Sequence, residues 1–422
     1  MPDRIQPPLF QFDTRIKTGV TSVRLKNGIP VFMLDAGTEE IMRIEFVFRA
    51  GSSKEYVPLL ASSTNMMLTE GTENFSSEEL NSVLDYYGIF LSLSAEKDSA
   101  GIIMYFLNKQ IRKALELASE ILFKPVFPDK EFSILMNKRI RWHLINREKV
   151  QNLAMDEFLE SIFGSQHPYG RQVKEEDFRN LIPTVLRDFH SKFYTPENLG
   201  IIISGRIHEK TTELLNRYLG EIRTKKNYIE ETLNHLQGKA QNHLRIEKNG
   251  ALQAAIRIGS STIKKTDPDY PGLKFLNTIL GGYFGSRLMK NIREEKGFTY
   301  GIHSSVSSFR ESGLLVISTD VGTEYVQDTI HEIYSEIRRL QNDAVKNDEI
   351  KVVRNFVSGE LLRMFNGPFA LAESFKAVWE FGLDFTYYDR LAEKVKTISQ
   401  DEIIRLATTY YDIDKLYEVV AG

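Results

Sequence analysis

The chain has 422 residues, of which 42% are hydrophobic and 26% are charged, so it can form two or three globular domains with sizeable cores. Its 54 basic and 57 acidic residues leave a formal charge of −3, which argues against nucleic acid or an anionic membrane surface as partner. The absence of cysteine excludes disulfides, thiolate metal sites and cysteine nucleophiles.

The beginning of the chain carries charged side chains and lacks the apolar stretch of a secretory signal. No apolar run approaches the roughly 20 residues of a membrane-spanning helix. We therefore expect a cytoplasmic protein without a membrane span, and we leave a periplasmic location open.

The first half alternates strands with helices. Two short alternating stretches, TSVRL and IPVFMLD, flank Asn27-Gly28 and predict a tight hairpin, and MRIEFVF predicts a third strand. Helical spacing follows over residues 57–69, and Ser76 and Glu79 have the spacing of a capping box for the next helix. The stretches IFLSLSAE and GIIMYFL predict two further strands, which helices follow.

The second half repeats this order of elements. FVFRAGSS is answered by IRIGSST, and FYTPENLGIIISG by YYDIDKLYEVVAG. Three anchors recur at nearly one offset: Gly259 follows Gly51 by 208 residues, Gly297 follows Gly88 by 209, and Tyr411 follows Tyr194 by 217.

This repeat predicts an α+β protein of two homologous halves, each an antiparallel-rich sheet packed with several helices. We assign the first half to residues 1–222, a polar linker to residues 223–249, and the second half to residues 250–422.

Catalytic motifs are missing. No two of the eight histidines are three or four residues apart, so no pair can share a helical face as metal ligands. The sequence also lacks the G-x-S-x-G, Walker and dinucleotide-binding motifs. By motif alone, the chain is not a self-sufficient enzyme.

The segment GGYFGSRLMKNIREEKGFTYGIHS carries one candidate pair. It predicts a helix that ends near Gly297 and a strand that begins near Phe298. Arg293 near the end of the helix and Tyr300 in the strand could reach one concave site and hold a carbonyl oxygen or an oxyanion. The alternative is that Arg293 only offsets the helix dipole and that Tyr300 is a half-buried strand residue.

The stretch SRLMKNIREEKGFTY resembles the second-half signature S-R-L-x-x-x-[IV]-R-E-x-x-G-L-x-Y of pitrilysin/insulinase-type zinc peptidases, in the branch of mitochondrial processing peptidase. Phe298 replaces the signature leucine. The segments FRAGSSKE, EGT, SSEEL and FGSQHPYGR follow in family order in the first half, so the resemblance covers essentially the whole chain.

The resemblance also shows what this chain lacks. Active relatives carry H-x-x-E-H on the helix before a Gly-Thr pair, with two zinc-binding histidines and a glutamate base. Alignment on Gly71-Thr72 puts Ser62 and Met66 at the histidine positions and Asn65 at the glutamate position. The distal glutamate falls near residues 151–154, which are Gln-Asn-Leu-Ala, with Asp156 and Glu157 close by.

These positions define a degenerate zinc site. We expect this chain to bind no zinc and to hydrolyse nothing alone. We also expect Ser62 and Asn65 to face a water-filled chamber, where small polar groups need not be desolvated.

Relatives without the zinc motif usually pair with a zinc-bearing homologue. The resemblance therefore implies a non-catalytic, substrate-positioning subunit of a heterodimeric zinc endopeptidase, with zinc in the partner and an extended peptide as substrate. Arg293 and Tyr300 would hold the substrate carbonyl, and the strand near residues 304–308 could align the peptide by strand addition. The alternative is a structural or peptide-binding homodimer without a proteolytic role.

Overall fold

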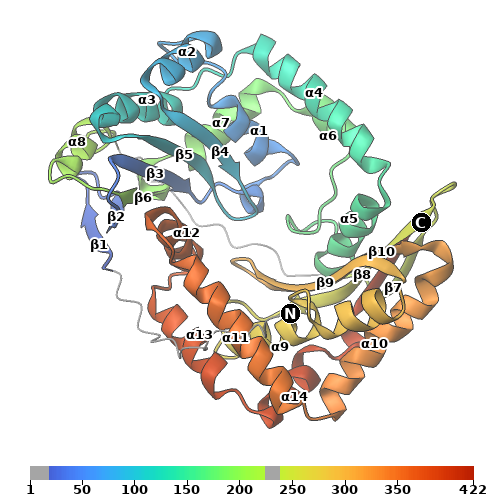
Figure 1. Cartoon of the computed structure of the whole chain (residues 1–422). Coiled ribbons are helices and arrows are strands. Elements are labelled where there is room, and N and C mark those ends of the chain that lie inside the picture. The colour runs from blue at the N-terminus through green and yellow to red at the C-terminus, as the bar shows by residue number, and fades with distance from the viewer. Residues whose placement is uncertain (1–18, 224–237) are drawn as a thin grey trace, which may run out of the picture.

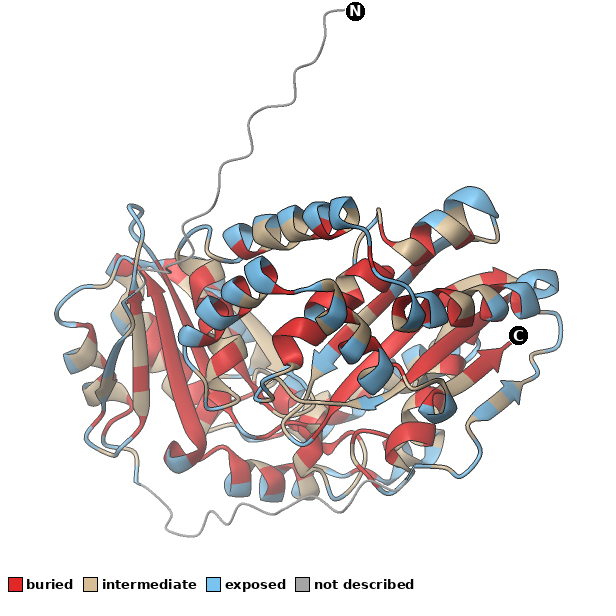
Figure 2. Cartoon of the chain, turned by 90° about the horizontal axis from the view of Figure 1, so that it is seen from below, coloured by how far each residue is buried: buried red, intermediate tan, exposed pale blue. Residues whose placement is uncertain are grey.

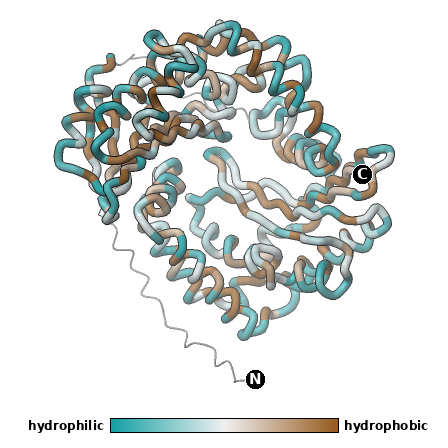
Figure 3. Tube along the Cα trace, turned by 45° about the horizontal axis from the view of Figure 1, so that its top comes forward, coloured by the Kyte–Doolittle hydropathy of each residue, from teal (hydrophilic) through white to brown (hydrophobic). Residues whose placement is uncertain are grey.

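The computed structural model describes residues 19–223 and 238–422. It is an α+β fold of two halves, each with one sheet and several helices, as the sequence predicts (Figure 1). The central strands of each sheet are buried along most of their length, whereas the outer helix faces are exposed (Figure 2). Hydropathy follows the same division, with hydrophobic segments running through the sheets and hydrophilic segments at the periphery (Figure 3).

The sheet of the first half consists of six strands: β1 (Thr21–Arg24), β2 (Pro30–Asp35), β3 (Ile41–Phe48), β4 (Phe90–Ala95), β5 (Ala100–Leu107) and β6 (Leu199–Gly205). Their order is β1-β2-β6-β3-β5-β4, and only β2 and β6 pair in parallel. The predicted hairpin is confirmed, with Thr21 opposite Met33 and Gly28 at φ 89° in the turn.

The described part of the first half contains these helices: α1 (Leu60–Met67), α2 (Ser77–Tyr87), α3 (Ile111–Phe123), α4 (Asp129–Arg147), α5 (Val150–Phe163), α6 (Glu175–Asn180), α7 (Pro183–Phe193) and α8 (Thr211–Tyr218). The predicted capping box opens α2. Ser76 Oγ accepts from the Glu79 N–H, and the Glu79 carboxylate accepts from the Ser76 N–H.

The second half contains five strands and the following helices: β7 (His243–Ile246), β8 (Gln253–Thr262), α9 (Tyr270–Gly281), the π-helix η4 (Met289–Glu295), β9 (Thr299–Ser308), β10 (Gly313–Gly322), α10 (Val326–Asn342), α11 (Asn347–Met364), α12 (Pro368–Trp379), α13 (Thr386–Thr397), α14 (Gln400–Tyr410) and β11 (Tyr417–Ala421).

The strand order of the second sheet matches that of the first. The order β7-β11-β8-β10-β9 corresponds position by position to β2-β6-β3-β5-β4. In each half the first two strands of this series are parallel and the rest are antiparallel. The predicted duplication is therefore confirmed at the level of topology.

One helix of each half packs against the sheet of the other half. Helix α5 packs Ala154 and Phe158 into a buried cluster with Ala255 and Val419 of the second sheet. Helix α12 packs Phe375 and its neighbours against the first sheet (Figure 1). This reciprocal exchange buries apolar surface between the halves and holds them together.

The predicted linker contains ordered structure. Residues 224–237 lie outside the described residues, but 238–249 include β7, which is the counterpart of β2 in the repeat. The Lys239 N–H also donates to Ser161 O of α5 at 2.8 Å. The repeat unit of the second half thus begins with β7. In the part of the chain that the structure describes, every helix is too short or too polar to cross a membrane.

Candidate functional site

The positions that the sequence analysis aligned with the zinc motif, Ser62, Asn65 and Met66, lie on α1. Helical stepping of 100° per residue puts residues 62, 63 and 66 on one side of this short helix. Ser62 is partly exposed, Met66 is 39% exposed, and Ser63 is fully buried.

Arg139 of α4 lies against this face of α1. Its guanidinium donates to Ser63 Oγ at 2.5 Å and to Ser62 Oγ at 2.9 Å. The same guanidinium carbon lies 5.8 Å from the ring centroid of Phe178. The sequence analysis did not find Arg139, because 77 residues separate it from Ser62 and no motif links them.

Asn65 does not face water, so that part of the prediction is wrong. The residue is 1% exposed, and its amide donates to Gly101 O at 2.9 Å and to the Tyr194 hydroxyl at 3.3 Å. A polar side chain can be buried here because the strand backbone and the phenol supply its hydrogen bonds. Asn65 therefore ties α1 to β5 and to the end of α7.

The start of α1 is strained and held by a buried carboxylate. Leu59 precedes the helix at φ 69°, a left-handed conformation that is uncommon for leucine. Glu55 accepts from the Ala61 N–H at 2.7 Å and lies 3.5 Å from the guanidinium of Arg171. Burial raises the pKa of Glu55 to about 7, although Arg171, Arg139 and Lys97 oppose the increase.

The region of the distal ligand also departs from a zinc site. Residues 151–154 lie on α5, where Glu157 forms an ion pair with Lys239. Burial raises the pKa of Asp156, while His143 and Lys97 oppose this change. In the described ranges, no group of three or more histidine, aspartate or glutamate side chains is arranged to hold a metal ion. The residues around α1 do not fit zinc.

The second candidate pair lies in the other half. Arg293 is on η4, where the predicted helix takes the π form, and its guanidinium stacks 4.6 Å from the centroid of Phe284. Tyr300 is near the start of β9 and is 93% exposed. A backbone bond from Phe298 N–H to Ile292 O, at 3.0 Å, joins the two segments.

The two arginines of the second-half signature have different environments. Arg287 forms two hydrogen bonds with the carboxylate of Glu349, at 2.8 and 2.9 Å, which fix it structurally. Arg293 is partly exposed and packs on Phe284, which is itself 63% exposed. Phe284 is a further residue that the sequence analysis did not single out. A common role for Arg293 and Tyr300 stays a prediction.

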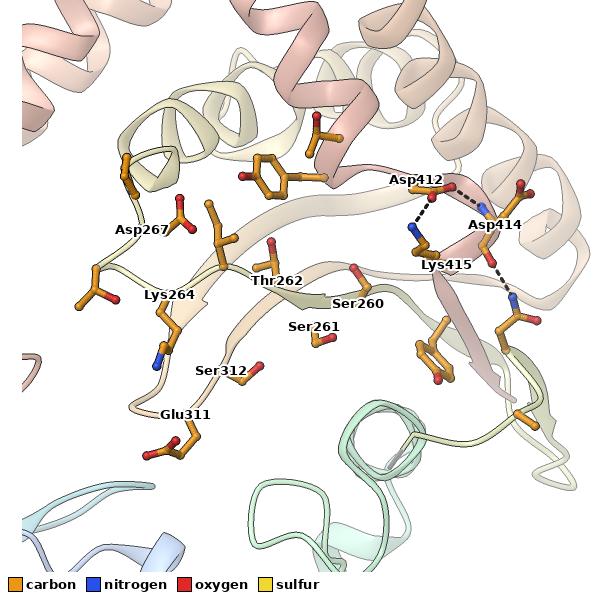
Figure 4. Close-up of a pocket in the computed structure, with 18 residues that line it drawn as sticks. Ser260, Ser261, Thr262, Lys264, Asp267, Glu311, Ser312, Asp412, Asp414 and Lys415 are labelled. Carbon is orange, nitrogen blue, oxygen red and sulfur yellow. Dashed lines mark hydrogen bonds and ion pairs between the residues drawn. The ribbon is translucent and has the colours of Figure 1, made fainter. Parts of the chain in front are cut away.

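A separate polar cavity of about 1020 Å³ lies at one end of the second sheet (Figure 4). The hydroxyls of Ser260 and Thr262 from β8 line it, together with an ion pair of 2.9 Å between Asp412 and Lys415. It contains none of the predicted site residues, and its hydroxyl and carboxylate groups do not form the nucleophile and base arrangement of a hydrolase.

Comparisons with known proteins agree with the motifs. Residues 180–357 match the family model described as "Peptidase M16 inactive domain". Two relatives come from Bacillus subtilis. The "Uncharacterized zinc protease YmxG" is 22% identical over 343 residues, covering 80% of this chain and 82% of the relative. The "Probable inactive metalloprotease YmfF" is 21% identical over 407 residues, covering 89% and 93%.

Solved structures show the same fold. A peptidase M16 inactive domain from Pseudomonas fluorescens superposes with a TM-score of 0.88 at 21% identity, covering 96% of this chain and 98% of that chain. A protease from Helicobacter pylori gives a TM-score of 0.87 at 16% identity, covering 96% and 99%. The comparisons support the pitrilysin-type family without distinguishing a branch of it, and the solved structures show that the fold extends over nearly the whole chain.

Proposed function

We propose, on the premise that this chain is a pitrilysin-type fold without zinc ligands, that it is the substrate-positioning subunit of a zinc endopeptidase. Its partner would be a homologue that carries H-x-x-E-H and the zinc ion. The observation that carries this proposal is the contrast between two sites. On α1, Ser62 is bound to Arg139, whereas the second-half signature is retained, with Arg293 partly exposed and Tyr300 almost fully exposed.

The chemistry of Arg293 and Tyr300 suits the binding of a peptide carbonyl. A guanidinium and a phenol both donate hydrogen bonds, and they stabilise negative charge that develops on the oxygen as the bond is attacked. The 93% exposure of Tyr300 leaves its hydroxyl accessible to a bound peptide or to a partner. Stacking on Phe284 restricts the orientation of the Arg293 guanidinium, which lowers the entropy lost on binding.

Strand β9 offers a means of aligning an extended peptide. It is the outermost strand of the second sheet, so one of its edges is not paired within that sheet. An extended substrate could add to this edge through main-chain hydrogen bonds, which explains how a subunit could bind many sequences.

The test is reconstitution with the zinc-bearing homologue from the same organism. The mixture should cleave peptides that neither chain cleaves alone. Arg293→Ala in this chain should lower kcat/KM of the mixture by about 100-fold, a size typical of losing one donor to a developing oxyanion. Lys290→Ala is the matched control, because Lys290 is an exposed cation on the same π-helix.

Two results would contradict the proposal. One is an unchanged kcat/KM for Arg293→Ala in an active mixture. The other is a stable homodimer that binds peptides but confers no cleavage on the zinc-bearing homologue, which would favour the structural alternative.

A further inference from the structure

A positively charged side chain lies against the face of α1 that carries Ser62, Ser63 and Met66. Arg139 reaches from α4 and is held by hydrogen bonds to Ser62 and Ser63, with donor–acceptor distances of 2.9 and 2.5 Å. Both acceptors are neutral hydroxyls, so these bonds fix the guanidinium without neutralising it. Burial lowers the pKa of Arg139, but a guanidinium stays charged throughout the physiological range.

The guanidinium also blocks the space that a ligand would need. A histidine side chain extends further from the helix than a serine hydroxyl does. An imidazole at position 62 would therefore enter the volume that Arg139 now fills, 2.9 Å from Ser62 Oγ. Position 66, one turn later, points to the same side of α1.

Other cations surround the same end of the helix. Lys97, Arg139 and Arg171 all interact electrostatically with Glu55, and Lys97 also interacts with Asp156 and Asp98. Of the three cations, Arg139 contacts Ser62 directly, so it repels a further cation placed beside that residue.

From these contacts we infer that the guanidinium of Arg139 has replaced the metal as a fixed positive charge and actively excludes divalent cations from α1. The site is closed to zinc because of Arg139, and not only because two histidines are missing. This inference uses the alignment of Ser62 and Met66 with ligand positions. It concerns this chain alone, so it can hold even if the proposed partnership fails.

The experiment measures zinc binding by isothermal titration calorimetry, with zinc content of the dialysed protein as a second readout. Ser62→His/Met66→His places two histidines four residues apart on α1, a spacing that supports metal binding on a helix. We expect this variant to bind zinc weakly. Adding Arg139→Gln should tighten the Kd at least about tenfold, because a unit charge within a few ångströms of the ion is removed.

The matched control is Ser62→His/Met66→His/Arg141→Gln. Arg141 is an exposed arginine on the same helix, two residues from Arg139, so its removal changes net charge equally without opening the site. This control should bind zinc no better than the two-histidine variant. Thermal melting of each variant checks that it is folded before the titration.

Three results would overturn the inference. The two-histidine variant could already bind zinc as tightly as the Arg139→Gln variant. The Arg141→Gln control could give the same gain. Neither histidine variant could bind zinc at all, which would mean that Arg139 is not the barrier.

Discussion

Helices α1 and α9 occupy equivalent places in the two halves. Each carries a buried asparagine that bonds to a strand and lies beside a tyrosine. Asn65 of α1 donates to Gly101 O and to the hydroxyl of Tyr194. Asn277 of α9 donates to Ser304 O at 2.9 Å and lies 3.5 Å from the hydroxyl of Tyr411. Each tyrosine follows the helix that precedes the last strand of its half, α7 or α14.

This similarity points to a structural role for Asn65. The sequence prediction aligns it with the catalytic glutamate of active relatives, yet its hydrogen bonds are structural, as those of Asn277 are in the second half. In both halves a buried amide joins a helix to the sheet and to a tyrosine, although Asn65 donates to β5 and Asn277 donates to β9.

The two helices differ in how a cation approaches them. On α1 the charge comes from outside, through Arg139 of α4. On α9 it belongs to the helix itself, because Lys274 reaches Val306 O at 3.4 Å and burial lowers its pKa.

The largest expected effect comes from removing the buried asparagine of either half. Asn65→Leu and Asn277→Leu should each lower the free energy of unfolding by about 3 kcal/mol, because two buried polar partners lose a hydrogen bond. Urea unfolding followed by circular dichroism measures this. Asn81→Leu, on an exposed face of α2, is the control with little effect. A large loss for Asn277→Leu with almost none for Asn65→Leu would show that the halves differ.

The second prediction concerns the pH dependence of stability that Glu55 gives to the first half. The pKa of Glu55 in the folded chain is about 7, above its ordinary 4.5, so the folded state binds the proton more tightly than the unfolded state. The stabilisation is full below pH 4.5 and disappears as pH rises through 7. Glu55→Gln should therefore reduce the loss of stability between pH 5 and pH 8 by roughly 2.5 kcal/mol.

Denaturation at a series of pH values measures this difference, and glutamine keeps an acceptor for the Ala61 N–H. An identical pH profile for Glu55→Gln and the unmodified chain would refute it.

A smaller effect is expected at Arg139. Arg139→Met retains an unbranched apolar stem but removes the donors to Ser62 and Ser63, so stability should fall by about 1–2 kcal/mol. Hydrogen exchange should locate the change in α1, with α9 unaffected. Equal changes in both helices would contradict the specific role of Arg139 in the first half.

The smallest expected effect is at Tyr300. Since this side chain is 93% exposed, Tyr300→Ala should change the free energy of unfolding by less than about 0.5 kcal/mol. Differential scanning calorimetry tests this. A substantial loss of stability would support the alternative view of Tyr300 as a structural strand residue.

Much of the fold was predictable because its signals are local. The hairpin at Asn27-Gly28 and the capping box at Ser76 depend on residues a few positions apart, and the structure confirms both. The duplication was visible because homologous halves keep the same order of turns and strands. The π-helical form of η4 and the strand β7 within the assigned linker were not predicted, since neither has a strong local pattern.

The sequence by itself determined that α1 carries no zinc-binding histidines and that the Arg293 and Tyr300 signature is present, because residue identity at aligned positions is enough for both conclusions. Only the tertiary structure decided what took the place of the ligands. Arg139 meets Ser62 across 77 residues, and Asn65 meets Tyr194 across 129, because the packing of α4 and α7 against α1 brings them together. Such contacts depend on how distant helices pack, and no short-range pattern encodes them.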